Sequence, residues 1–191
     1  VLIAAHYDST SGCPGADDNA TGTAATLEAA RVLAMRDYPL TLVAACWDEE
    51  ERGLVGATAY AARARAAGED IVVNYNLEMI GFTNDAPGSQ RLPDGTGLLF
   101  PDAMRELDAR DGRGDFLAII ADEAAAMHVA GLERYAGRVG LPTIDLIVPE
   151  SLLGNAAIGD LRRSDHAAFW DEGYPAMMLT DTSEFRYDPY H

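Results

Sequence analysis

The sequence predicts an α/β protein of three layers, in which helices cover both faces of a mostly parallel, doubly wound mixed sheet. Three short apolar runs, residues 1–5, 40–46 and 71–77, have the length and composition of buried parallel strands. Helical patterns lie between these runs, so two strand–helix–strand units follow one another along the chain. The 191 residues are 48% apolar and include 18 glycines, which fits one domain with a sizeable core.

The first half of the chain gives its predicted elements clear start and stop signals. Asp18 or Asn19 can cap a helix that runs to about residue 35. A second helix, about residues 55–67, is rich in alanine and arginine and ends at a glycine. Cys46 closes the apolar run that precedes this helix, and we interpret it as a small core residue.

Residues 82–114 are predicted to form a long surface loop within a single domain that covers residues 1–191. Pro-Gly and Asp-Gly pairs interrupt any periodic pattern there, and one helical turn is expected near residues 103–107. Regular structure is expected to resume in a strand at 116–121, a helix at 123–138, a strand at 143–148, a short helix at 165–170 and a strand at 176–180.

The net charge of the chain limits the classes of molecule that it can be expected to bind. The net charge is −17, and all 14 basic residues are arginine. Without lysine, Schiff-base and P-loop lysine chemistry are excluded. So acidic a surface disfavours nucleic acid and anionic membranes and favours multivalent cations, although a solubility or high-salt adaptation would have the same composition. No apolar run approaches the length of a membrane span, and the two cysteines establish no disulfide framework.

Side chains of the kinds that bind metals follow the predicted strands. Four consecutive acids come after the run 40–46, and taken alone such a run is more often a solvated loop. His6 and Asp8 leave the first strand on one side of the chain, so Asp8 can support a metal-bound imidazole. The remaining candidates are Asp17, Asp18, Glu78 and His166. Because the carboxyl ends of parallel strands meet at one edge of a sheet, these residues predict a divalent cation site, and imidazole favours zinc.

Five segments together resemble the ordered motif set of the M28 family of zinc metallopeptidases, and they span nearly the whole chain. They are Ala5-His6-Tyr7-Asp8-Ser9, Gly15-Ala16-Asp17-Asp18-Asn19-Ala20-Thr21-Gly22, Glu50-Glu51-Arg52-Gly53-Leu54, Asn76-Leu77-Glu78-Met79-Ile80-Gly81 and Ser164-Asp165-His166. The resemblance implies the phosphorylase/hydrolase-like fold of zinc exopeptidases and a centre of two zinc ions.

The resemblance also implies a role for each matching residue. The metal ligands would be His6, Asp17, Glu51, Glu78 and His166, with Asp17 bridging the two ions and Asp8 supporting His6. Glu50 would be the general base on the bridging water. Glu78 stands where the family usually has aspartate, and its extra methylene changes the reach of that ligand. Some relatives polarise the scissile carbonyl with a tyrosine in the loop before the last histidine, and residues 141–165 contain none.

The activity that the resemblance implies is that of a zinc-dependent exopeptidase, specifically an aminopeptidase acting on peptides or small proteins. Two other functions stay open: a single-zinc acyltransferase similar to glutaminyl cyclases, and a non-catalytic binding domain on the same scaffold. The family habit of export predicts a secreted or periplasmic protein, although the chain shows no signal peptide. His191 ends the chain where relatives continue, so truncation at both ends is expected. Neither the preferred side chain nor the oligomeric state follows from the sequence.

Overall fold

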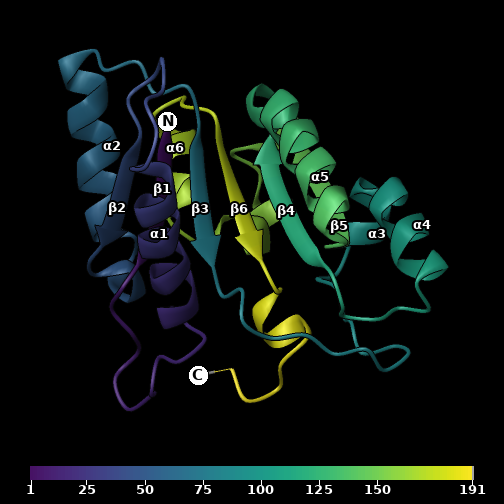
Figure 1. Cartoon of the computed structure of the whole chain (residues 1–191). Helices are drawn as coiled ribbons and strands as arrows, with labels where there is room; N and C mark the ends of the chain where they lie inside the picture. The colour runs from purple at the N-terminus through teal and green to yellow at the C-terminus, as the bar shows by residue number, and fades with distance from the viewer. Residues whose placement is uncertain (191) are drawn as a thin grey trace.

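The computed structural model describes residues 1–190, and six strands form one sheet between two layers of helices (Figure 1). The strand order is β2-β1-β3-β6-β4-β5, and neighbours are parallel except that β4 runs antiparallel to β6. The strands are β1 Leu2–His6, β2 Val43–Trp47, β3 Asn74–Glu78, β4 Leu117–Asp122, β5 Thr143–Val148 and β6 Ala176–Thr180. The predicted mixed, mostly parallel sheet is confirmed.

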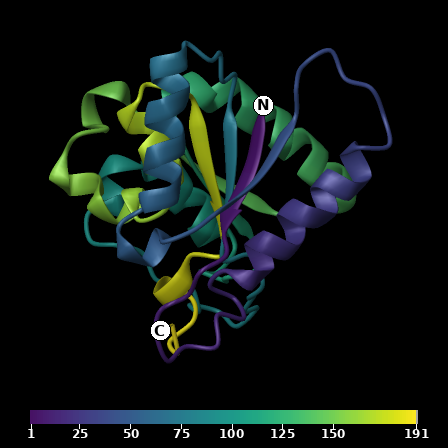
Figure 2. The ribbon, with the colours of Figure 1, turned by 90° about the vertical axis from the view of Figure 1, so that its left-hand side faces the viewer.

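Helices pack on both faces of this sheet. They are α1 Ala20–Leu33, α2 Val55–Ala67, α3 Thr96–Leu99, α4 Pro101–Ala109, α5 Ala126–Val139 and α6 His166–Asp171. The face that bears Leu2 and Ala4 packs against α2 and α6, whereas the face that bears Ala5 packs against α1 and α5. Figure 2 shows α1 and α2 on opposite sides of the sheet, which confirms the doubly wound, three-layer arrangement.

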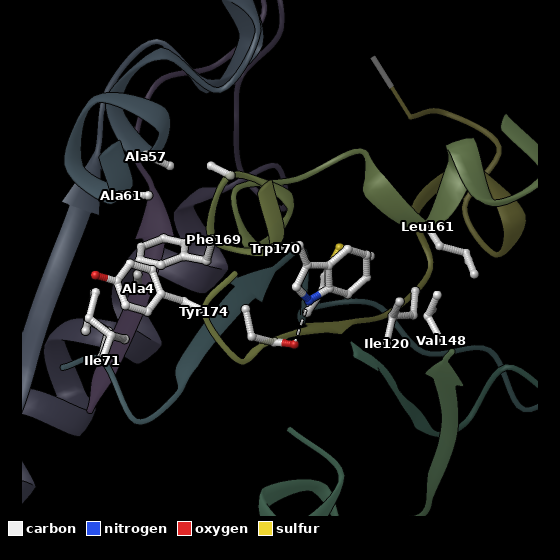
Figure 3. Close-up of a cluster of buried hydrophobic side chains, with 14 of the residues drawn as sticks. Ala4, Ala57, Ala61, Ile71, Ile120, Val148, Leu161, Phe169, Trp170 and Tyr174 are labelled. Carbon is white, nitrogen blue, oxygen red and sulfur yellow. Dashed lines mark hydrogen bonds between the residues drawn. The ribbon is translucent and has the colours of Figure 1, made fainter. Parts of the chain in front are cut away.

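The largest core cluster fixes α6 between the sheet and α2 (Figure 3). Phe169 is fully buried, and the alanines that α2 turns inward, Ala57 and Ala61, leave room for its ring. Trp170 donates a hydrogen bond from its indole N–H to the carbonyl of Ala176 at 3.0 Å. Close packing of this kind holds the start of α6 at a fixed position beside β3.

Several predicted elements agree with the observed ones. The second helix spans Val55–Ala67, and the strands at 143–148 and 176–180 have the predicted bounds. Asn19 is the N-cap of α1, because its side chain accepts a hydrogen bond from the N–H of Gly22 at 3.1 Å. No helix in residues 1–190 is both long and apolar enough to cross a membrane.

Two predictions about the fold are wrong. Residues 82–114 are not one irregular surface loop, because they contain α3, α4 and the buried side chains of Phe100 and Leu107. Pro101 lies in the first turn of α4, where its missing N–H costs nothing. Cys46 is exposed rather than part of the core, because β2 is an edge strand and its pattern alternates between half-buried and exposed residues.

Candidate metal centre

The centre forms where two neighbouring parallel strands end. His6 is the last residue of β1 and Glu78 the last residue of β3, and these strands pair directly. Because side chains alternate along a strand, His6 lies on the same face as Leu2 and Ala4, the face covered by α2 and α6. His6 is 1% exposed and Glu78 7% exposed. An imidazole and a carboxylate are therefore buried together at the edge of the sheet where α/β proteins bind ligands.

Carboxylates surround both nitrogens of the His6 ring. Nε2 lies 3.2 Å from an oxygen of Asp18 and 3.2 Å from an oxygen of Glu78. Nδ1 lies 3.1 Å from the carbonyl oxygen of Asp8 and 3.4 Å from its carboxylate. Burial alone would lower the pKa of His6, but the hydrogen bonds to Asp18 and Glu78 outweigh it and raise the pKa to about 12.

Glu50 completes a group of three potential metal ligands. One ligand atom each from His6, Glu50 and Glu78 lie within 4.8 Å of one another, which is the distance range of a shared cation. Burial, followed by the charge of Glu78, raises the pKa of Glu50 to about 9. Asp8 fixes the start of this segment, because its two carboxylate oxygens accept the backbone N–H groups of Glu50 and Glu51 at 3.1 and 3.3 Å.

The donor set fits zinc. One imidazole and several carboxylates are ligands that zinc accepts. Burial is the main cause that raises the pKa of Glu50 and of Glu78, and the charge of a neighbouring acid adds to it. A bound cation would reverse both shifts, because it favours the ionised carboxylates. Asp8, on the outer nitrogen of His6, matches the usual support of a metal-bound histidine. That support, the metal ligation by His6 and Glu78 and the general-base role of Glu50 stay predictions.

The structure brings Asp18 to His6, and not Asp17 as the resemblance suggested. One oxygen of Asp17 instead accepts the N–H of Gly81 at 3.0 Å and the hydroxyl of Thr21 at 3.2 Å. Since Asn19 caps α1, neither acid is needed as the cap, and the two consecutive side chains leave the loop in different directions. We therefore correct the candidate ligand from Asp17 to Asp18.

His166 also lies elsewhere than the resemblance implied. Its ring is fully buried, Nε2 is hydrogen bonded to the carbonyl of Leu161 at 2.8 Å, and Trp170 packs edge-on against it at 4.5 Å. Burial lowers the pKa of His166 to about 4. Because α6 begins at His166 and packs into the core, the ring belongs to that core and not to the ligand group formed by the described residues.

Glu51 remains a candidate metal ligand, but its observed contact is with the protein backbone. One of its oxygens accepts the backbone N–H of Thr10 at 3.0 Å, so the carboxylate ties the loop after β1 to the segment after β2. Glu51 lines the same cleft as Glu50 and Asp18. Its ligand role stays a prediction.

Two residues that sequence reasoning missed lie against the centre. Ser164 donates a hydrogen bond to Glu78 at 2.6 Å and accepts one from Asn76 at 2.8 Å, so the start of α6 holds the Glu78 carboxylate. Tyr190 lines the cleft together with Glu50 and Glu78, and it follows the segment 141–165, where some relatives have a carbonyl-polarising tyrosine. Burial, followed by the charge of Asp18, raises the pKa of the Tyr190 phenol. His191 lies outside the described residues.

Two hollows meet at this centre. The first, the acidic cleft, is lined by Asp18, Glu50, Glu51, Glu78, Arg162, Arg163 and Tyr190. The second, the apolar pocket, runs over the sheet beneath α4, and its deep walls are the buried side chains Leu107, Phe116, Ala118, Ile144 and Leu146. Glu78, Arg163 and Tyr190 line both hollows, so the pocket opens onto the cleft.

Comparison with known proteins places this sequence in a family. The sequence pattern of peptidase family M28 matches residues 1–191. The uncharacterized protein YfbL of Escherichia coli is 34% identical over 203 aligned positions, which cover 100% of this chain and 58% of YfbL. A protein of Leptosphaeria maculans named "Probable zinc metalloprotease" is 29% identical over 96% of this chain and 43% of its own length.

A solved structure agrees with the fold. The zinc aminopeptidase BSAP of Bacillus subtilis superposes with a TM-score of 0.59 at 22% identity, covering 94% of this chain and 35% of BSAP. The chain thus spans about half the length of the relatives that it matches. It belongs to peptidase family M28.

Proposed function

We propose that the chain carries the catalytic centre of a zinc-dependent aminopeptidase. The observation that carries this proposal is the cluster of His6, Glu50 and Glu78, with Asp18 in contact with His6, at the opening of an apolar pocket. In this cluster His6 and Glu78 would bind the metal and Glu50 would act as the base. Family membership supports a metallopeptidase, and BSAP supports the aminopeptidase assignment by its name.

We propose that the centre binds two zinc ions, because two divalent cations match the number of carboxylates in the acidic cleft. Four carboxylates line the acidic cleft, namely Asp18, Glu50, Glu51 and Glu78. One divalent cation would leave half of this negative charge without compensation, whereas two would balance it. Asp18 and Glu78 both reach Nε2 of His6, so they are the natural ligands of a shared first ion.

In the proposed mechanism the zinc ions would lower the pKa of a bound water and polarise the substrate carbonyl. Glu50 accepts the proton of that water and passes it to the leaving amine. Its backbone is held by Asp8, so the carboxylate has a fixed place in the cleft. Tyr190 is protonated at neutral pH, and burial raises its pKa further above the ordinary value of 10, so the phenol can donate a hydrogen bond to the substrate carbonyl oxygen.

The charges of the cleft favour cleavage at an amino terminus over cleavage at a carboxyl terminus. Its two arginines are already engaged, Arg162 with Asp171 and Arg163 with Glu184. Neither arginine is therefore available to bind the terminal carboxylate of a substrate, as cleavage at a carboxyl terminus would need. The apolar pocket would take the side chain of the terminal residue, and the rest of the peptide would leave through an open cleft beside Phe82 and Tyr187.

The test is the Glu50→Gln variant with zinc content measured alongside release of p-nitroaniline from leucine p-nitroanilide. We expect activity to fall by roughly 2–4 orders of magnitude while zinc stays bound. Glu49→Gln is the matched control, because Glu49 is exposed and pairs with the exposed Arg52. Equal activity of wild type and Glu50→Gln would remove Glu50 from the mechanism.

A second assay separates the aminopeptidase from the open alternatives. N-acetylation of the anilide substrate removes the ammonium group, and we expect it to abolish release. Cyclisation of a glutamine-initiated peptide with a single bound zinc would favour the acyltransferase, and zinc binding without turnover of any peptide would favour a binding domain. Export to the periplasm or medium stays a proposal, which cell fractionation tests.

A further inference from the structure

The apolar pocket has a charged pair where it meets the acidic cleft. Arg163 lines both hollows, and its guanidinium forms an ion pair with the carboxylate of Glu184, which also lines the pocket. Arg91 donates a hydrogen bond to the backbone carbonyl of Glu184 and pairs with Asp188 at 2.7 Å, so the segment that carries Glu184 is itself tied down. The Arg163 guanidinium lies 5.9 Å from the ring centre of Tyr190.

The two charges at this junction compensate each other at close range. The side chain of Arg163 is 43% exposed and that of Glu184 33% exposed, so neither is fully hydrated. Asp160, the other acid near Arg163, is farther away at 3.9 Å. One oxygen of Glu184 is buried and has no hydrogen-bond partner among residues 1–190, so Glu184 depends on Arg163 for its compensation.

Among the described residues, the buried side chains that form the deep walls of the pocket are all apolar. The walls beyond the junction are Leu107, Phe116, Ala118, Ile144 and Leu146, all buried. A lysine or glutamate side chain placed there would lose its hydration without gaining a partner. Selectivity against charged side chains therefore depends on whether the junction itself offers an uncompensated charge.

We propose that the Arg163–Glu184 ion pair determines the substrate side chain that the pocket accepts. While the pair is intact, each charge cancels the other and the pocket takes uncharged apolar side chains. With Arg163 removed, Glu184 would attract a basic side chain, and with Glu184 removed, Arg163 would attract an acidic one. This proposal rests on the proposed aminopeptidase function.

The experiment compares the 191-residue chain with the variants Arg163→Met, Glu184→Gln and the double variant. The ratio of kcat/KM values is measured for leucine, lysine and glutamate p-nitroanilides, and binding of the three corresponding amino acid amides is measured by calorimetry. We expect Arg163→Met to raise the lysine-to-leucine ratio about tenfold and Glu184→Gln to raise the glutamate-to-leucine ratio by a similar factor. The double variant should return to the preference for leucine.

The matched control is the pair Arg31–Glu28 on α1, which is an ion pair of the same kind but lies on an exposed helix surface. Arg31→Met and Glu28→Gln should leave all ratios unchanged. Ratios and amide affinities that stay within about twofold of wild type in both single junction variants would overturn the proposal. If the amide affinities change as expected in the two single variants but the wild-type chain releases no terminal residue, the proposed aminopeptidase activity is overturned and the role of the ion pair is not.

Discussion

Ser164 donates a hydrogen bond to Glu78 at 2.6 Å, and this contact joins the start of α6 to the metal centre at the end of β3. Ser164 is itself fully buried and accepts a hydrogen bond from Asn76 at 2.8 Å. The carboxylate of Glu78 therefore has a position set by the core helix as well as by its own strand. Its longer side chain, compared with the aspartate usual in the family, reaches within 3.2 Å of His6 in this arrangement.

The first prediction follows from this contact. Ser164→Ala removes the acceptor of the buried Asn76 amide and one of the hydrogen bonds to Glu78, so the free energy of unfolding should fall by about 1–3 kcal/mol. Zinc affinity should fall roughly 10–100-fold, the range typical of residues that orient a ligand. Urea unfolding and zinc titration against a competing chelator measure both effects. Ser151→Ala, at an exposed position, is the control, and equal zinc affinity of the two variants would contradict the role of Ser164.

The second prediction separates Asp18 from its neighbour. Asp18→Asn should weaken zinc binding by more than the roughly 10–100-fold expected for a supporting residue, because Asp18 lies 3.2 Å from Nε2 of His6. Asp17→Asn keeps an oxygen that can accept the N–H of Gly81, so its zinc affinity should stay within about tenfold of wild type. Zinc titration of both variants decides between the two aspartates. A larger loss in Asp17→Asn would restore the assignment that the resemblance implied.

The third prediction concerns the stability of the zinc-free chain at different pH. Glu50 has a pKa of about 9 in the folded state and an ordinary value of 4.5, so between these values the folded state holds a proton that the unfolded state has lost. His6 acts in the same direction: its contribution is fully present below its ordinary value of 6.5 and is lost as the pH rises through about 12. The free energy of unfolding in chelator should therefore be lower at pH 8 than at pH 5.

Urea unfolding at the two pH values in the presence of chelator measures this dependence. In Glu50→Gln the decrease between pH 5 and pH 8 should be smaller, because one of the contributing groups no longer titrates. Saturating zinc should reverse the trend, since zinc binds the deprotonated ligands and its affinity rises with pH. If the free energy of unfolding of the zinc-free chain is constant or rises toward pH 8, the acids of the centre do not govern its pH dependence.

Much of the fold could be predicted because local signals mark its elements. The strand Thr143–Val148 follows Pro142, the strand Ala176–Thr180 follows Pro175, and α2 ends at Gly68, so apolar runs and helices have sharp limits. α4 could not be predicted in full, because it is stabilised by burying Leu107 against Phe116 and Ala118, which come later in the chain. The exposure of Cys46 depends on the position of β2 at the sheet edge, which composition does not specify.

In the candidate site, too, some features follow from the local sequence and others depend on contacts with distant segments. That His6 and Glu78 lie at the same edge follows from strand order and from the alternation of side chains, both of which a sequence can indicate. The directions of Asp17 and Asp18 are decided by hydrogen bonds to Gly81 and to His6, from other segments of the chain. The same holds for His166, whose ring is retained in the core by Leu161 and Trp170.

The fourth prediction tests whether the core behind α6 supports the centre. Phe169 is fully buried, and its ring lies 6.2 Å from that of Trp47 and 6.3 Å from that of Tyr60. Phe169→Ala should lower the free energy of unfolding by about 3–5 kcal/mol, because the cavity adds to the lost burial. Phe169→Leu keeps most of the volume and should cost much less.

The functional consequence follows from the position of Phe169 in the same short helix that starts beside Ser164. Loosened packing of α6 should weaken the hold of Ser164 on Glu78, so Phe169→Ala should also lower zinc affinity, whereas Phe169→Leu should retain most of it. Met127→Ala, at a position that is 77% exposed on α5, serves as the control and should change stability by no more than about 0.5 kcal/mol. If Phe169→Ala loses stability but binds zinc as tightly as wild type, the centre is held by the strand ends alone.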